Sequence, residues 1–139
     1  MGDHQHLVEQ HFKAWSSGDI DGIVACFSEE CVFEDLALQA TFEGHAALRE
    51  FAAAAFAALP DFQWTATKIF SDGANVCIES HFSGTQTGDF PGIPATGKAV
   101  DIPCLTVEEI RDGKVRRHRD YWSLATYLQQ VGLMPSAEG

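Results

Sequence analysis

Apolar side chains recur at helical spacing through the first part of the chain. Leu7, Phe12 and Trp15 belong to positions three or four residues apart that form one face of a helix. Gly18 can end that helix in a left-handed conformation, and Asp19 can cap a second, shorter helix. The apolar positions of this second helix are Ile20, Ile23, Val24 and Phe27. The pattern therefore predicts two consecutive helices joined by a tight turn.

A short apolar run and a long alanine-rich segment follow. Cys31–Phe33 is predicted to be a strand that closes at Glu34 and Asp35. Residues 45–59 carry large apolar side chains on one side and many alanines, and Pro60 stops the segment. We expect this segment to form a long helix, and its signal is the clearest of the helices.

After Pro60 the apolar positions alternate with the period of strands. The strands predicted from this period are residues 62–69, 76–84, 98–110 and 114–122. Asp72 and Gly73 form the turn of the first hairpin, and a glycine- and proline-rich loop at 87–97 separates it from the second. Residues 124–131 are predicted to form a final short helix.

Three helices followed by a strongly bent, mostly antiparallel sheet make an α+β arrangement in which the sheet wraps around the long helix and encloses a cavity. The chain has 139 residues, enough for one core without metal or disulfide support. No linker or internal repeat divides it. We therefore expect a single domain over residues 1–139.

The charge of the chain restricts its partners. The formal net charge is -11, from 9 basic and 20 acidic residues, which disfavours nucleic acids and anionic membranes as partners. The clustered basic residues Arg116, Arg117 and Arg119 are interpreted as a solvated or interface-pairing face, with anion recognition as the alternative.

Further compositional features concern the compartment of the protein. Cys26, Cys31, Cys77 and Cys104 show no C-x-x-C spacing, which favours a reduced, cytoplasmic setting. The first ten residues lack the pattern of a signal peptide, and no apolar stretch approaches the ~18 residues that span a bilayer. We expect neither export nor membrane insertion.

Asp35 is the leading candidate for chemistry. An acid at the end of a buried strand loses hydration, so its pKa rises and it becomes a usable general base near neutral pH. The alternative is a surface acid that begins a turn or caps a helix.

The last predicted strand offers two sets of candidates, because successive side chains point to opposite faces. His118, Asp120 and Trp122 share one face, while Arg117, Arg119, Tyr121 and Ser123 share the other. If the first set faces the cavity, His118 and Asp120 form an acid–base pair. If the second does, Tyr121 and Ser123 polarise a carbonyl group, and Asp120 forms a salt bridge with an arginine on the outer face.

Aromatic and histidine side chains are candidates for ligand binding. The aromatic candidates for an apolar pocket, or for the core, are Trp15, Trp64, Phe90 and Trp122. His81 can enter the cavity opposite Asp35 or be a structural residue, and His11 can donate a hydrogen bond or lie in the core. His4 and His6 have no partners with ligand spacing, so we expect no metal, and no cofactor.

Several motifs give the chain a family resemblance. W-x-x-G-D-x-D-G-I-V-x-x-F over residues 15–27, followed by V-x-E-D at 32–35, resembles the start of the nuclear-transport-factor-2-like superfamily. The later segments Leu-Pro-Asp at 59–61, Gly-Thr-Gln-Thr-Gly-Asp-Phe at 84–90 and Pro-Ala-Thr-Gly-Lys at 94–98 resemble the SnoaL-like polyketide cyclases within it. The resemblance implies a cone-shaped α+β fold with a hydrophobic pocket, a homodimer, and cofactor-independent chemistry on a small hydrophobic molecule. Asp35 matches the proton-shuttling aspartate of the ketosteroid isomerases.

The chain departs from these families at positions that carry chemistry. The oxyanion-hole tyrosine of the isomerases falls at His11, and their protonated aspartate falls near Leu105. The catalytic aspartate of the cyclases falls at Ser123, three residues after Asp120, and Gln86 replaces a histidine of their loop.

Three hypotheses follow. The first is a cyclase- or isomerase-type enzyme that uses Asp35. The second is a ligand-binding or interaction module without catalysis. The third is an enzyme resembling ketosteroid isomerase, or one resembling limonene epoxide hydrolase, in which Asp35, Asp120 and a strand arginine surround a water.

Overall fold

The fold is seen in a computed structural model, which describes residues 2–90 and 92–135. The helices are α1 (Gly2–Ser16), α2 (Ile20–Ala25), α3 (Gly44–Ala58) and α4 (Leu124–Gln130). The strands are β1 (Phe27–Asp35), β2 (Ala40–Glu43), β3 (Gln63–Asp72), β4 (Asn75–Thr85), β5 (Ala99–Arg111) and β6 (Lys114–Trp122). The strands form one sheet in the order β2-β1-β6-β5-β4-β3.

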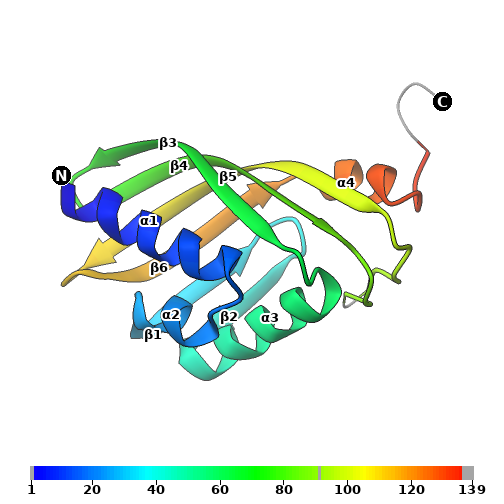
Figure 1. The fold of residues 1–139 in the computed structure, drawn as a ribbon. Coiled ribbons are helices and arrows are strands. Elements are labelled where there is room, and N and C mark those ends of the chain that lie inside the picture. The colour runs from blue at the N-terminus through cyan, green and yellow to red at the C-terminus, as the bar shows by residue number, and fades with distance from the viewer. Residues whose placement is uncertain (1, 91, 136–139) are drawn as a thin grey trace.

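The sheet is mixed and strongly curved, and the first three helices lie against it (Figure 1). Helix α1 packs on β3, α3 packs on β1 and β2, and α4 packs on β5. Strands β1 and β6 run parallel, whereas the other neighbouring strands are antiparallel. The predicted α+β fold with a bent, mostly antiparallel sheet is confirmed.

The turn between the first two helices forms as its sequence predicts. Gly18 has a φ of +68°, a conformation that glycine adopts without strain. The Asp19 carboxylate accepts a hydrogen bond of 2.9 Å from the Gly22 backbone N–H, so Asp19 is the N-cap of α2. This turn directs the chain from α2 into β1.

Two boundaries differ from the prediction. Phe27 is the first residue of β1 and not the last apolar position of α2, because α2 ends at Ala25 and the strand is longer than the Cys31–Phe33 core that periodicity indicated. Strand β2 was not predicted. Its four residues alternate only between half-buried and exposed, which leaves too weak a signal for a pattern to detect.

The side chains of β5, and those of β6 from Arg117 onward, alternate between the two faces of the sheet. Inward positions of β5 include Cys104, Thr106 and Glu108, and inward positions of β6 include His118 and Asp120. This alternation selects the first of the two sets predicted for the last strand. None of the helices in residues 2–90 and 92–135 has the length and apolar character needed to cross a bilayer.

Candidate functional site

An apolar pocket lies between the helices and the inner face of the sheet. It encloses about 580 Å³, including the part open to solvent at its mouth. Its aromatic lining residues are Trp15, Phe33, Phe51, Phe62, Trp64, Phe82, Phe90, Trp122 and Tyr127. Its two ionisable carboxylates are Asp35 and Asp120. Pockets lined mainly by apolar and aromatic side chains, with a few polar groups, hold small organic ligands.

Asp35 ends β1 inside this pocket. Its side chain is 5% exposed, and it accepts hydrogen bonds of 3.0 Å from the Leu38 backbone N–H and from Trp122 Nε1. Burial, and secondarily the negative charge of Asp120, raise the pKa of Asp35 to about 6, although these donors oppose the rise. Asp35 is therefore a carboxyl group that exchanges a proton close to neutral pH.

Asp120 is the neighbour of Asp35 in the parallel pairing of β1 with β6. It is 5% exposed, and its Oδ1 accepts hydrogen bonds from Thr106 Oγ1 at 2.6 Å and from His118 Nε2 at 2.8 Å. Its Oδ2 accepts none of the hydrogen bonds made by the described residues. The two carboxylates thus stand side by side in the pocket wall, with one oxygen of Asp120 available to a ligand.

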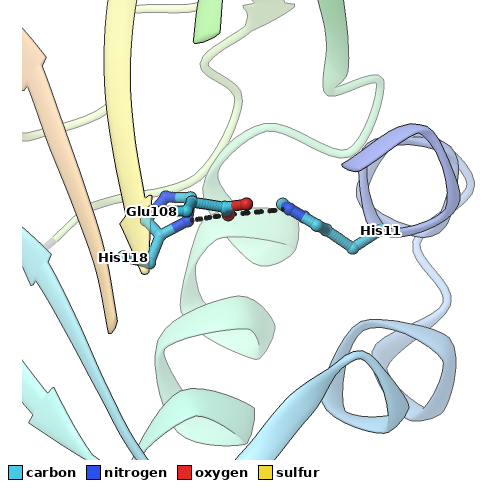
Figure 2. Close-up of side chains that lie close together, drawn as sticks. All are labelled: His11, Glu108 and His118. Atoms are coloured by element: carbon cyan, nitrogen blue, oxygen red, sulfur yellow. Dashed lines mark hydrogen bonds and ion pairs between the residues drawn. The ribbon is translucent and has the colours of Figure 1, made fainter. Parts of the chain in front are cut away.

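Behind Asp120 a chain of polar groups continues into the core. His118 Nδ1 lies 2.6 Å from Glu108 Oε2, and His11 Nε2 of α1 lies 2.8 Å from the same oxygen (Figure 2). The His11 contact does not have the geometry of a hydrogen bond, because the Glu108 oxygen lies away from the direction in which a His11 N–H would point. The side chains of His11, Glu108 and His118 have no exposed surface. This chain links α1 to the pocket wall through two strands.

The charges within this chain stabilise one another. Burial alone would favour neutral groups, but the Asp120 and Glu108 carboxylates raise the pKa of His118 well above its usual range. In the same way, burial is outweighed by His11 and His118, which hold the pKa of Glu108 below its usual range. The directions of both shifts favour the charged forms of His118 and Glu108.

The same three residues form a group that has the chemistry of metal ligands. His11 Nε2, Glu108 Oε2 and His118 Nδ1 lie within 4.8 Å of one another. However, ligands bound at about 2.0–2.1 Å to a tetrahedral metal stand about 3.3 Å apart. The separations of 2.6 and 2.8 Å from Glu108 Oε2 are shorter, and the 2.6 Å contact with His118 matches a charge-assisted hydrogen bond. The spacing fits an ion-pair chain better than a metal centre.

Gln86, the residue that replaces the family histidine, is fully buried and joins three parts of the pocket wall. Its Oε1 accepts a hydrogen bond of 2.6 Å from the Tyr127 hydroxyl of α4, and its Nε2 donates to the Ile93 carbonyl at 2.9 Å. Gln86 thus supports the loop that carries Phe90 and Ile93. Sequence reasoning noted the substitution but missed this role.

The predicted aromatic candidates Trp15, Trp64, Phe90 and Trp122 all line the pocket. Three other candidates do not. His11 lies behind the pocket wall, His81 points outward and lies 3.1 Å from Asp101, and Tyr121 is 41% exposed on the outer face. His81 and Tyr121 occupy outward positions of β4 and β6, and His11 packs against Glu108 in the core.

Two of the three arginines of β6 also face outward. Arg117 and Arg119 both contact Glu34, at 2.9 and 3.1 Å, on the face of the sheet opposite the pocket. An Asp-Arg-Asp arrangement around a water is therefore wrong for this chain, since Asp35 and Asp120 face the other way. The interpretation of the arginines as an outer, ion-pairing face is consistent with these contacts.

The positions where the chain departs from its families have other roles. Leu105 is 39% exposed on the outer face, so no oxyanion donor arises there. Ser123 is the N-cap of α4 and accepts from the Thr126 backbone N–H. Asp120, three residues earlier, is the acid that reaches the pocket.

Glu108 is the residue of this site that sequence reasoning missed. The signal was present, because strict alternation along β5 places it on the same face as Ile102, Cys104 and Ile110. An acid at an apolar position of a strand indicates a buried partner. One partner, His118, lies on the other strand of the predicted hairpin, whereas His11 was not accessible to sequence reasoning because it is far away along the chain.

Comparison with known proteins identifies the family. The family model described as SnoaL-like polyketide cyclase matches residues 5–131. No curated protein sequence matches the chain significantly.

Solved structures show the same fold at low sequence identity. TsrD from Streptomyces laurentii has a TM-score of 0.87 at 24% identity, covering 96% of this chain and 98% of its own. A protein with a ketosteroid isomerase-like fold from Catenulispora acidiphila DSM 44928, in complex with trimethylamine, has a TM-score of 0.82 at 24% identity, with 91% and 92% covered. TerC, co-crystallised with polyporic acid, has a TM-score of 0.80 at 17% identity, with 94% and 98% covered. Because the family model spans nearly the whole chain, this protein belongs to the SnoaL-like polyketide cyclase family.

Proposed function

We propose that this protein is a cofactor-independent acid–base enzyme of the cyclase or isomerase type that acts on a small hydrophobic carbonyl compound. The observation that carries the proposal is the pair of adjacent carboxylates, Asp35 and Asp120, in the wall of an otherwise apolar pocket. A buried carboxyl group with a pKa of about 6 is matched to proton transfer at carbon near neutral pH.

Asp35 is the proposed proton carrier. Its carboxylate removes a proton from the carbon next to a carbonyl group and becomes a carboxylic acid. In an intramolecular aldol reaction the resulting enolate carbon then attacks a second carbonyl carbon of the same molecule, and a carbon–carbon bond forms. The alkoxide oxygen so produced takes the proton back from Asp35, so the enzyme returns to its starting state. In an isomerisation the proton returns to a different carbon.

The other lining groups have supporting roles in this proposal. Asp120 Oδ2 accepts a hydrogen bond from a ligand hydroxyl group and so orients the ligand. The indole Nε1 of Trp15 is buried without a hydrogen-bond partner in the described part of the chain. We assign it the role of donor to the oxygen on which negative charge develops, since such a donor stabilises an enolate.

The pocket lining indicates the class of ligand. Aromatic and aliphatic side chains surround the two carboxylates, and no lysine, arginine or histidine is among the lining residues in the described ranges. A ligand that carries its own carboxylate or phosphate inside the pocket would be repelled. The proposed substrate is therefore an uncharged ketone or ester with an apolar skeleton.

The test is proton–deuterium exchange at the carbon next to the carbonyl group of small aromatic ketones, followed by proton NMR in deuterium oxide. The wild-type protein is expected to accelerate exchange, and Asp35→Asn is expected to abolish the acceleration. Glu34→Gln is the matched control, because it changes the adjacent acid on the outer face. Equal exchange with wild type and Asp35→Asn would refute Asp35 as the proton carrier.

A second candidate is a binding module without catalysis. Two carboxylates among aromatic rings also favour a small organic cation, because ring faces and carboxylates both attract positive charge. The related Catenulispora acidiphila protein was solved with trimethylamine. Calorimetric titration with trimethylamine distinguishes the candidates: binding that is lost in Asp35→Asn, together with no ketone exchange by the wild type, would favour this second function.

We also propose a homodimer. Leu105, Val107 and Tyr121 expose 36–41% of their surface on the outer face of β5 and β6, beside the Arg117, Arg119 and Glu34 cluster. A mixed apolar and ion-pairing sheet face is suited to a twofold contact between copies. Light scattering is expected to give twice the chain mass for the wild type and a monomer for Leu105→Lys; a monomeric wild type at micromolar concentration would contradict the proposal.

The cysteines suit a cytoplasmic protein, which is our proposal for its location. Cys26, Cys31, Cys77 and Cys104 are all free within the described structure. Burial raises the pKa of the Cys26, Cys31 and Cys104 thiols, which keeps them protonated and slow to oxidise. Fractionation of the native host, with this protein found in the membrane or exported fraction, would contradict a cytoplasmic location.

A further inference from the structure

The polar chain behind the pocket is unusual for the core of a small protein. Glu108 and His118 are completely buried, and charges removed from water destabilise a fold unless they are paired and hydrogen-bonded. An apolar pair at these positions would pack without that penalty. Within this polar network, Asp120 is the only residue that lines the pocket, which suggests that the buried Glu108 and His118 act through it.

The geometry of His118 defines its protonation. Its two ring nitrogens lie 2.6 Å from a Glu108 oxygen and 2.8 Å from an Asp120 oxygen. A neutral imidazole has one N–H, so one of these contacts would set a nitrogen lone pair against an ionised carboxylate. Only the imidazolium donates to both carboxylates. Its ring is held in place by Phe33, which stacks on it with centroids 4.3 Å apart and planes at 7°.

The pairing of these residues across β5 and β6 fixes the orientation of Asp120 in the pocket wall. His118 and Glu108 face each other as a cross-strand pair of β6 and β5, and Thr106 and Asp120 form the next inward pair. Both His118 and Thr106 donate to Asp120 Oδ1, which holds one rotamer of that carboxylate. Glu108 in turn holds the positive charge on His118.

We propose that Glu108 and His118 are positioning residues: Glu108 keeps His118 as an imidazolium ion, and His118 holds Asp120 in one orientation beside Asp35. The two adjacent carboxylates then have separate roles, with Asp120 as the fixed hydrogen-bonding group and Asp35 as the group that gains and loses the proton. This assignment of roles to the two carboxylates rests on the proposed acid–base function, whereas the protonation state of His118 does not.

Among the described residues, the titratable groups that face this polar network are His11 from α1, Cys26 at the end of α2, Asp35 from β1, Cys104 and Glu108 from β5, and His118 and Asp120 from β6. The polar network ends at His11, whose Nδ1 is buried without a partner in the described structure.

The experiment is a nitrogen-15 NMR titration of the histidine rings in the uniformly labelled full chain, between about pH 5 and 9, with His118→Gln for assignment. In the wild type, both ring nitrogens of His118 are expected to stay protonated across this range. In Glu108→Gln, the proton affinity of His118 is expected to fall about tenfold or more, because one of its two carboxylate partners is gone. Glu109→Gln, the same change one residue further along β5, is the matched control and is expected to behave as the wild type.

Two outcomes would overturn the proposal. One is a neutral His118 ring in the wild type near pH 7, a result that needs no variant and stands even if Glu108→Gln does not fold. The other is a folded Glu108→Gln protein in which His118 titrates as in Glu109→Gln.

The separate roles of the carboxylates are tested by the pH dependence of the ketone exchange reaction. Wild type is expected to keep its activity on the alkaline side of the Asp35 titration, and Glu108→Gln is expected to lose activity once His118 loses its proton. An unchanged pH profile in that variant, with the expected nitrogen-15 result, would refute the positioning role alone. If instead the wild type shows no exchange while His118 remains protonated, the proposed function fails and the state of His118 stands.

Discussion

Replacing Asp35 with asparagine is expected to stabilise the protein at alkaline pH and destabilise it at acid pH. The pKa of Asp35 is about 6 in the folded protein, against 3.8 for a solvated aspartate. Asp35 therefore binds its proton more tightly in the folded state than in the unfolded state. Protonation of Asp35 stabilises the fold fully below pH 3.8, and this stabilisation is lost as pH rises through 6. At about 1.36 kcal/mol per pH unit, the ionised Asp35 costs the folded state at most about 3 kcal/mol above pH 6.

Asparagine removes this charge but not all of the hydrogen bonding. Its single carbonyl oxygen can accept from either the Leu38 N–H or Trp122 Nε1, and its amide group faces the other donor. Losing that hydrogen bond costs about 1 kcal/mol. The variant is therefore expected to be more stable than wild type by about 2 kcal/mol at pH 8 and less stable by about 0.5 kcal/mol at pH 4, with a crossing near pH 4.5.

Urea unfolding followed by tryptophan fluorescence measures this difference directly, since Trp15, Trp64 and Trp122 surround the site. Glu34→Gln is a control with the opposite sign. Burial by itself would raise the pKa of the Glu34 carboxyl, but Arg119 and Arg117 together outweigh it and hold that pKa below its usual range, so this variant loses stability relative to wild type as pH rises. A stability difference between Asp35→Asn and wild type that does not change with pH would refute a desolvated, like-charge environment for Asp35.

Three further predictions concern packing, the Gln86 bond and the two carboxylates. Leu48→Ala is expected to lower the free energy of unfolding in urea by about 3 kcal/mol and Phe51→Ala by about 2 kcal/mol, because Leu48 is fully buried whereas Phe51 is half-buried beside an existing pocket. A larger loss for Phe51→Ala than for Leu48→Ala would contradict this packing. Tyr127→Phe leaves the buried Gln86 Oε1 without its donor and is expected to cost about 1–3 kcal/mol of stability. The control Tyr121→Phe, on the outer face, is expected to change stability by less than about 0.5 kcal/mol. Equal effects of the two changes would be inconsistent with the hydrogen bond from Tyr127 to Gln86. Asp120→Asn is expected to lower the pKa of Asp35, but not to the value of a solvated aspartate, because Asp35 remains buried. Carbon-13 NMR of the carboxyl groups measures this pKa, and an unchanged value would show that the two carboxylates do not interact.

The helices and most strands of this protein were predictable because their signals are local. The alanine-rich stretch before Pro60 forms α3, and the Asp72-Gly73 turn joins β3 to β4. Gly18 and Asp19 form the expected turn and cap. The weak elements were not predictable, since the four residues of β2 form a strand only by pairing with β1.

The candidate site was predictable only in part, for a similar reason. Asp35 at the end of a short apolar strand was identified from its position, and its raised pKa follows from burial and from Asp120. The orientation of the last strand was left open because alternation defines two faces without saying which is inside. The parallel pairing of β6 with β1, residues that are distant in the chain, decided it.

By itself, the sequence determined the order of helices and strands, the family, and the presence of an acid at the end of β1, because capping, turns and periodicity depend on neighbouring residues. Only the tertiary structure decided that Asp120 lies beside Asp35, that Tyr121 and His81 face outward, and that Glu108 is paired with His11 and His118 in the core. Those contacts join α1, β1, β5 and β6. They arise when the curved sheet closes over the helices, and no local pattern encodes the distance between side chains on separate strands.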